Sequence, residues 1–209
     1  ILMKVLGLIG LAGSGKTTYA RRISGRVLSF AEPVKAICSR LVGGDVVKDK
    51  DYTINTMTLR EHLKSEFEGL GYRVKDLSDS NITFILEGRT LLQYVGTDHV
   101  NHFIGKEAHK SIWKDITARR ILQYMYEIPQ EKYIVVDDVR FKHELDIFDE
   151  IVLVVTDGVK PLDHDSEKLA RKMTKAFYKG TLHKKYPNVK VLHNKLTSSG
   201  IVWANKPLM

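Results

Sequence analysis

The sequence predicts an α/β protein in which a parallel sheet is covered by helices on both faces. Apolar runs with the length of buried strands lie within residues 4–9, 132–136 and 151–155, the first two of which begin with a lysine, and stretches with helical patterning separate them. Strands buried on both faces have this continuous apolar character, and intervening helices make neighbouring strands parallel. The first run leads directly into a glycine-rich loop and then a helix, an order of elements that is typical of phosphate-binding α/β folds.

That loop, Gly10–Thr17, has the pattern G-x-x-x-x-G-K-T. Glycines let the backbone curl so that successive N–H groups point at one anion, and the following helix adds its partial positive charge. The sequence therefore predicts a three-layer P-loop NTPase fold, with Lys16 reaching the β- and γ-phosphates of ATP and Thr17 holding Mg²⁺. The residues expected to bind ATP are Gly10, Ala12, Gly13, Ser14, Gly15, Lys16, Thr17 and Thr18. The alternative, a plain glycine-rich turn between a strand and a helix, leaves the Lys-Thr pair unexplained.

The remaining elements follow from periodicity and from helix start and stop signals. Pro33 suits a helix start, Gly43-Gly44 ends that helix, and Thr58–Glu61 is a capping box. We expect helices at about 16–24, 33–42, 58–69, 90–95, 106–126 and 142–148, the fourth of them stopped by Gly96. Further strands are expected at 26–30 and 189–192 and a loop at 45–56, whereas 72–85 has no clear assignment.

Length and composition limit the class of protein. The chain has 209 residues, which suits one α/β domain with a small inserted subdomain. Its net charge of +8 suggests acidic ligands, either nucleotides or nucleic acid. The single cysteine, Cys38, excludes an internal disulfide framework and fits a reducing cytoplasm. No apolar run reaches the roughly 18 residues of a membrane span, so no membrane contact is expected.

Two carboxylates, Asp137 and Asp138, directly follow the apolar strand at 132–136. In open parallel sheets, ligands gather at the carboxyl ends of the strands. An aspartate there can hold Mg²⁺ opposite the phosphate loop, directly or through water. The alternative is a turn in which an aspartate caps the next helix. The residues alone do not decide which of the two serves the metal.

Three polar side chains are candidates for the acceptor site. Lys35 lies one turn into the helix that follows the second strand, where it faces either a cleft or solvent. Arg89 has the planar guanidinium that clamps a phosphate, and Gln93 has an amide that can read a base edge. Each of these residues is equally compatible with an ordinary solvated helix surface.

The most basic part of the chain lies between the last two strands, at residues 158–190. A basic segment in this place can close over a triphosphate as a lid and supply charge to the transition state. Arg171 is the best candidate in it, because a guanidinium suits phosphoryl oxygens better than an ammonium does. A solvated charged helix is the alternative.

The segment Asn194–Thr197 resembles the N-K-x-D motif with which regulatory GTPases read guanine, but Thr197 stands in place of the aspartate. A hydroxyl cannot accept the paired guanine hydrogens as a carboxylate does. The chain also has no Asp-x-x-Gly after the strand at 132–136. Both absences argue against a switch GTPase.

Several segments together resemble the deoxynucleoside monophosphate kinases of tailed bacteriophages. In chain order they are Gly10–Thr17, Phe30–Lys35, the R-x-L-L-Q-x-x-G-T-D stretch Arg89–Asp98, the D-V-R-F-x-x-E stretch Asp138–Glu144, and Asp163–Glu167. The resemblance implies an NMP-kinase-like P-loop fold and transfer of the γ-phosphoryl group of ATP to a 5′-deoxynucleoside monophosphate (dNMP). It also implies Mg²⁺, a cytoplasmic location in the host cell if the protein is phage-encoded, and a role in nucleotide supply for DNA synthesis.

The resemblance also implies roles for individual residues. Arg89, Gln93 and Asp98 would lie near the acceptor nucleotide, and Arg140 would contact the transferred or acceptor phosphate. Asp138 matches the aspartate before Val-Arg and is therefore preferred over Asp137 as the functional carboxylate. The expected catalytic set is Lys16, Asp138, Arg140 and Arg171, and His164, Ser166 and Glu167 would mark the lid entrance. The implied layout is a core at about 1–30, 86–157 and 186–209, an acceptor-binding insert at about 31–85, and a lid at about 158–185.

Two other functions are compatible with the sequence. One is a P-loop kinase for another small phosphorylated metabolite, such as dephospho-coenzyme A or phosphomevalonate. The other is a nucleic-acid-binding or end-processing P-loop protein, which the positive charge suggests, although no basic stretch is rich in the aromatic residues of a stacking platform. We therefore expect small-molecule substrates and no stable nucleic-acid partner. A homodimer is compatible with the sequence, which does not decide the oligomeric state.

Overall fold

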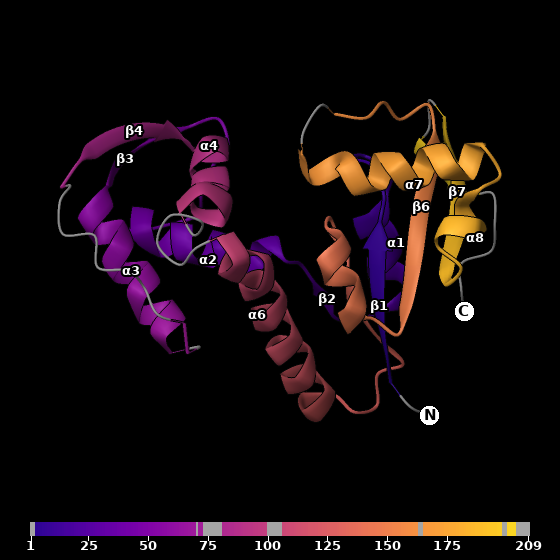
Figure 1. The fold of residues 1–209 in the computed structure, drawn as a ribbon, viewed down its shortest axis with the longest axis horizontal. Coiled ribbons are helices and arrows are strands. Elements are labelled where there is room, and N and C mark those ends of the chain that lie inside the picture. Colours follow the sequence, from indigo (N-terminus) through magenta and orange to yellow (C-terminus); the bar gives the residue numbers. More distant parts are fainter. Residues whose placement is uncertain are drawn as a thin grey trace. The chain divides into compact units, whose positions relative to one another are not determined.

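The computed structural model describes residues 3–69, 71–72, 81–99, 106–162, 165–197 and 200–203. The chain forms two compact units (Figure 1). The first contains residues 1–30 and 117–209, and the second contains residues 31–116.

A six-stranded sheet, mostly parallel, forms the centre of the first unit. Its strands are β1 (Lys4–Ile9), β2 (Val27–Leu28), β5 (Tyr133–Val136), β6 (Glu150–Asp157), β7 (Val189–Thr197) and β8 (Gly200–Trp203). Their order is β2-β5-β1-β6-β7-β8. The first five strands in this order are parallel, and β8 is antiparallel to β7. Strand β1 therefore lies between β5 and β6, which brings the residues that follow these three strands to one edge of the sheet.

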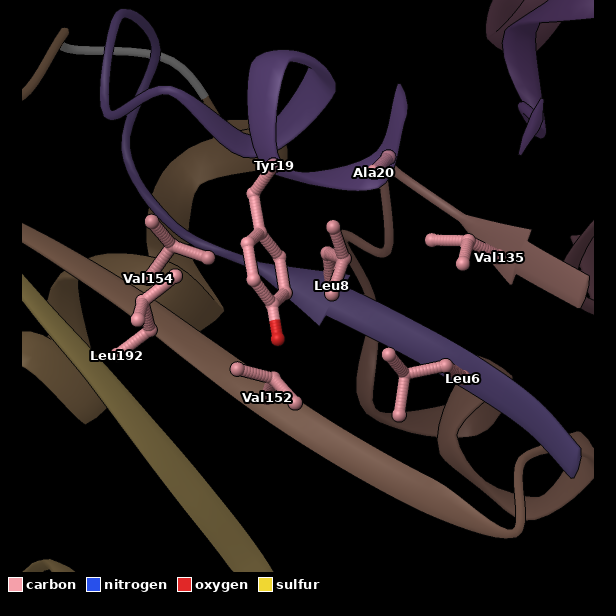
Figure 2. Close-up of a cluster of buried hydrophobic side chains, with 8 residues drawn as sticks. All are labelled: Leu6, Leu8, Tyr19, Ala20, Val135, Val152, Val154 and Leu192. Atoms are coloured by element: carbon pink, nitrogen blue, oxygen red, sulfur yellow. The ribbon is translucent and has the colours of Figure 1, made fainter. Parts of the chain in front are cut away.

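Helix α1 (Lys16–Ile23) packs against this sheet and forms the main apolar core of the unit. Figure 2 shows Tyr19 of α1 pointing onto Leu8 and the neighbouring valines of β6. The side chain of Tyr19 is fully buried. The cluster consists of Leu6, Leu8, Tyr19, Ala20, Val135, Val152, Val154 and Leu192. Because α1 begins at the glycine-rich loop, this packing fixes the position of the loop.

The segment after β6 contains the 3₁₀ turn η3 (Asp165–Glu167) and the helices α7 (Lys168–Tyr178) and α8 (Leu182–Lys185). Helix α7 buries one face, formed by Leu169, Ala170, Met173 and Ala176, and contacts β6. Helix α7 lies within the segment 158–185 that the sequence suggested as a lid. Its separate apolar and basic faces explain its packing on β6, because the apolar face needs a partner.

The second unit combines helices with a small antiparallel hairpin. Its elements are α2 (Ala31–Val42), β3 (Asp51–Asn55), α3 (Thr56–Glu68), β4 (Thr83–Glu87), α4 (Gly88–Gln93), the π-helix η1 (Tyr94–His99) and the first half of α6 (Lys106–Glu127). Strands β3 and β4 pair with each other. Helices α3 and α6 meet where the rings of Phe67 and Trp113 pack edge to face, with centroids 5.8 Å apart. This unit extends to Ile116, whereas the sequence suggested an insert that ends at about residue 85.

Three local expectations for this unit were wrong. Strand β3 replaces part of the loop expected at 45–56, since its short alternating pattern becomes a strand by pairing with the distant β4. Helical structure also continues past Gly96, which was expected to stop it. The Nε1 of Trp113 donates to the carbonyl of Gly96 at 2.8 Å, so this carbonyl has a partner inside the protein. Helix α3 begins two residues earlier than expected, because the side chain of Asn55 accepts from the N–H groups of Met57 and Thr58.

At the C-terminal side, strand β7 is longer than the expected 189–192, and it turns back into β8. Within the described ranges, none of the helices has both the length and the apolar character needed to cross a membrane.

Candidate nucleotide-binding site

The glycine-rich loop between β1 and α1 has the geometry of an open anion cradle. Gly13 and Gly15 adopt left-handed backbone angles, with φ of 78° and 85°, which other residues rarely adopt. A Cβ atom at Gly10 would lie 2.5 Å from the carbonyl oxygen of Val154, so only glycine fits there. Ala12, Gly13, Thr17 and Thr18 are exposed, as a ligand-binding loop requires. Among the described residues, no side chain caps α1, and its first turn has no acidic residue. Its N–H groups are thus available to an anion.

Buried hydrogen bonds from β6 and β7 stabilise the loop on its side toward the sheet. The hydroxyl of Thr156, at the end of β6, donates to the carbonyl of Ser14 at 2.9 Å. The amide of Asn194 in β7 lies 3.4 Å from the same hydroxyl, and Asn194 is fully buried. Thr197, the departure from N-K-x-D, donates to the carbonyl of Gly200 within the β7–β8 hairpin. These residues therefore stabilise the loop and the hairpin, which agrees with the argument against a switch GTPase.

The side chain of Lys16 curls over the loop. Its Nζ donates to the carbonyls of Gly10 and Leu11, both at 2.8 Å. Burial lowers the pKa of Lys16, and the charge of Glu167 is the strongest influence in the opposite direction. A partly desolvated ammonium held at this place interacts more strongly with phosphate oxygens than an exposed one does.

Thr17 and Asp137 form a pair of oxygen ligands beside the loop. The hydroxyl of Thr17 donates to Oδ2 of Asp137 at 2.5 Å. Burial raises the pKa of Asp137, the bond from Thr17 opposes this shift, and the neighbouring charge of Asp138 adds to it. A hydroxyl and a carboxylate are ligands that Mg²⁺ prefers, and this pair therefore fits that ion.

Asp138 was expected to hold Mg²⁺ together with Thr17, and its described hydrogen bonds lead to a different segment. Its carboxylate accepts from the hydroxyl of Ser29 and the N–H of Phe30, both at 2.7 Å, in the segment after β2. The two aspartates therefore have different hydrogen-bond partners. The sequence could not show which of them faces the loop.

Arg140 follows the two aspartates and is anchored at its backbone. Its N–H donates to Oε2 of Glu144 at 2.8 Å, and the N–H of Phe141 donates to the same oxygen at 3.0 Å. The guanidinium lies 3.8 Å from Asp138, and the side chain of Arg140 is 46% exposed. Burial raises the pKa of Glu144, in the 3₁₀ turn η2 (Lys142–Ile147), to about 7.

Glu167 connects the loop to the segment that precedes α7. One carboxylate oxygen accepts from the N–H of Ala12 at 2.7 Å, and the other accepts from the N–H of Leu162 at 2.8 Å. The residue is only 7% exposed. The sequence placed Glu167 at the entrance of a lid, and the structure adds that it binds the phosphate loop itself. No sequence signal indicates this contact, because 155 positions separate the two partners.

We expect Glu167→Ala to lower the free energy of unfolding by about 1–3 kcal/mol, because two backbone N–H groups lose the charged acceptor that they share. Chemical denaturation measures this change. Glu150→Ala is the matched control, since Glu150 binds the half-exposed side chains of Lys4 and Lys190, and such pairs contribute about 1 kcal/mol or less. Equal losses in the two variants would contradict the connecting role of Glu167.

The other predicted residues belong to further elements or lie outside the described part. Arg171 is a half-buried residue of α7. Lys35, Arg89 and Gln93 are exposed residues of the second unit, on α2 and α4. Asp98 belongs to η1, but its side chain is outside the described part, as is the whole of His164. The structure thus brings together Lys16, Thr17, Asp137, Asp138 and Arg140 in the first unit.

Comparison with known proteins gives little further information. No family model matches the chain, and no curated protein matches it. Among solved structures, it is similar to TT1252 from Thermus thermophilus, with 17% sequence identity and a TM-score of 0.39. That match covers 93% of this chain and 90% of the other. A likeness this weak identifies neither a family nor a function. The structure itself defines a mixed α/β protein with a mostly parallel sheet, compatible with a P-loop-like fold.

Proposed function

We propose that the protein is a kinase that transfers the γ-phosphoryl group of ATP to a 5′-dNMP, giving the diphosphate. One observation carries the proposal: the hydroxyl that follows Lys16 on the glycine-rich loop contacts a strand-end carboxylate at 2.5 Å. A phosphate cradle, an ammonium and a pair of oxygen ligands are the parts that phosphoryl transfer from a nucleoside triphosphate needs.

The residues of the first unit have separate roles in this proposal. The N–H groups of Gly13 and of residues 15–18 and the ammonium of Lys16 bind the phosphates of ATP, whereas the N–H of Ser14 donates to the carbonyl of Leu11 at 3.1 Å. Thr17 and Asp137 would hold Mg²⁺, which supplies positive charge to the phosphate oxygens. The left-handed glycines and the bond from Thr156 to Ser14 keep the loop in its binding conformation, so little reorganisation is needed when ATP binds.

The acceptor is already a dianionic phosphate and needs no strong general base. Arg140 is the proposed ligand of its phosphate, because its backbone is anchored and its guanidinium is exposed. Lys35, Arg89, Gln93 and Asp98 of the second unit are proposed to contact the acceptor nucleotide, as the resemblance to phage dNMP kinases implies. Arg171 is proposed to supply further charge.

A coupled assay with ATP, Mg²⁺ and a panel of acceptors tests the function directly. We expect diphosphate formation with one or more of the four dNMPs. The same panel should contain the ribonucleoside monophosphates, dephospho-coenzyme A and phosphomevalonate. If only one of the two metabolites is phosphorylated, that metabolite and not a dNMP is the acceptor. If no acceptor is phosphorylated, the proposed kinase activity is refuted.

We expect Arg140→Ala to reduce turnover by at least about a hundredfold, which is the typical loss when an electrostatic stabiliser of the transition state is removed. Stability should change by less than about 1 kcal/mol, because among the described residues the exposed guanidinium pairs with Asp138 at 3.8 Å, and exposed ion pairs contribute little. Steady-state kinetics and denaturation measure the two effects. A much smaller loss of turnover would leave Arg140 with a structural role only.

A further inference from the structure

A buried acid, Glu144, lies behind the arginine of the proposed site. Its side chain is only 4% exposed. One of its oxygens, Oε2, accepts from two successive backbone N–H groups, those of Arg140 at 2.8 Å and Phe141 at 3.0 Å. The buried carboxyl therefore holds the turn that follows β5 through two hydrogen bonds.

Capping of η2 alone does not account for this arrangement. A cap needs only an acceptor for the first N–H groups of a turn, and a small exposed polar residue provides that without the cost of burying an acid. The bond to the N–H of Arg140 adds something else, because it fixes the peptide from which the guanidinium extends. The side chain of Arg140 is held at its base and is 46% exposed at its end.

We propose that Glu144 is a positioning residue for Arg140: it fixes the main chain at Arg140 so that the guanidinium is presented to a phosphate oxygen. This inference rests on the proposed function, in which Arg140 binds the acceptor phosphate. Glu144 itself touches neither substrate and acts through the two backbone bonds.

The ionisation of Glu144 gives this role a pH signature. Burial raises its pKa to about 7, the charge of Asp138 adds to this shift, and the two N–H groups and the charge of Arg140 oppose it. A carboxylate accepts hydrogen bonds more strongly than a neutral carboxyl. The two hydrogen bonds that Glu144 accepts therefore weaken as the pH falls through about 7, and turnover should fall over the same range.

Stability should change with pH in the opposite direction. The pKa of Glu144 is raised in the folded state, from 4.5 to about 7. The resulting stabilisation is fully present below about pH 4.5 and is lost as the pH rises through about 7. A group that only stabilises the fold would not make turnover rise over the range in which stability falls.

NMR titration and kinetics of wild type, Glu144→Gln and Asp146→Asn test the proposal. Asp146 is an exposed carboxylate of the same turn η2 and serves as the matched control. In wild type and Asp146→Asn, the backbone amides of Arg140 and Phe141 should titrate with an apparent pKa near 7, and in Glu144→Gln they should not. At a pH above 7, Glu144→Gln should turn over about tenfold more slowly with an unchanged KM for ATP, and it should lose the acid limb that wild type shows.

Two results would overturn the inference. The first is that the two amides of wild type do not titrate near neutral pH. The second is that Glu144→Gln is less stable but keeps the turnover and the pH profile of wild type, which would make Glu144 a structural cap. A wild-type protein that transfers no phosphoryl group at any pH would refute the proposed function instead. The amide titration needs no turnover, so it would still show whether Glu144 titrates near neutral pH in that case.

Discussion

Lys16→Ala should abolish phosphoryl transfer while leaving the fold intact. The ammonium of Lys16 is the positive charge that the structure holds over the phosphate loop. Removing a charge that stabilises the transferring group costs about a thousandfold or more in turnover. Stability should change by no more than about 1 kcal/mol, because the carbonyls of Gly10 and Leu11 belong to a partly exposed loop and can bind water instead.

Lys195→Ala is the matched control for this experiment. Lys195 is exposed and lies in β7, the strand next to β6 in the same sheet. Lys195 has no proposed role in the site, so the variant should keep near-normal turnover. Calorimetric titration with ATP and Mg²⁺ should give strong binding for Lys195→Ala and much weaker binding for Lys16→Ala. Near-normal turnover of Lys16→Ala would count decisively against the assignment of the site.

The strand, glycine-rich loop and helix at residues 4–23 could be predicted from the sequence because their determinants are local. The glycines, Lys16 and Thr17 are adjacent in the chain, and the apolar run before them and the helical segment after them are also local. The parallel strands were recognisable for the same reason, since a strand buried on both faces is apolar throughout. Strand β3 was not recognisable, because its partner strand β4 is about 30 residues away and its buried residues Tyr52 and Ile54 lie on a strand that contacts α2, α3 and α4 only in the folded unit.

The supports of the site depend on distant contacts, so the sequence could not reveal them. Glu167 reaches back to Ala12, and Thr156 reaches back to Ser14, through bonds between segments that meet only in the folded sheet. A lone glutamate in a basic segment gives no sign that it will be buried. The choice between Asp137 and Asp138 was open for a different reason, since it depends on where β5 ends and on which side each side chain then faces.

Substitution of the two aspartates one at a time should separate their roles. Asp137→Asn should lower turnover by at least about a hundredfold and raise the Mg²⁺ concentration needed for half-maximal activity, because the amide is a much poorer ligand for the ion. Asp138→Asn should lower turnover by less than about tenfold. Its amide can still accept from the N–H of Phe30 and can donate to the hydroxyl of Ser29, which replaces both of the observed bonds.

Turnover measured across a Mg²⁺ titration distinguishes this assignment from the one that the family resemblance favoured. Asp138 as the metal ligand predicts the reverse order, with the large loss and the shifted Mg²⁺ dependence in Asp138→Asn. Each variant is the control for the other, because both remove one negative charge from adjacent positions at the same sheet edge. The contact of Asp137 with Thr17 at 2.5 Å is the reason to expect the larger effect at Asp137, since a metal held by the hydroxyl needs its second protein ligand within reach.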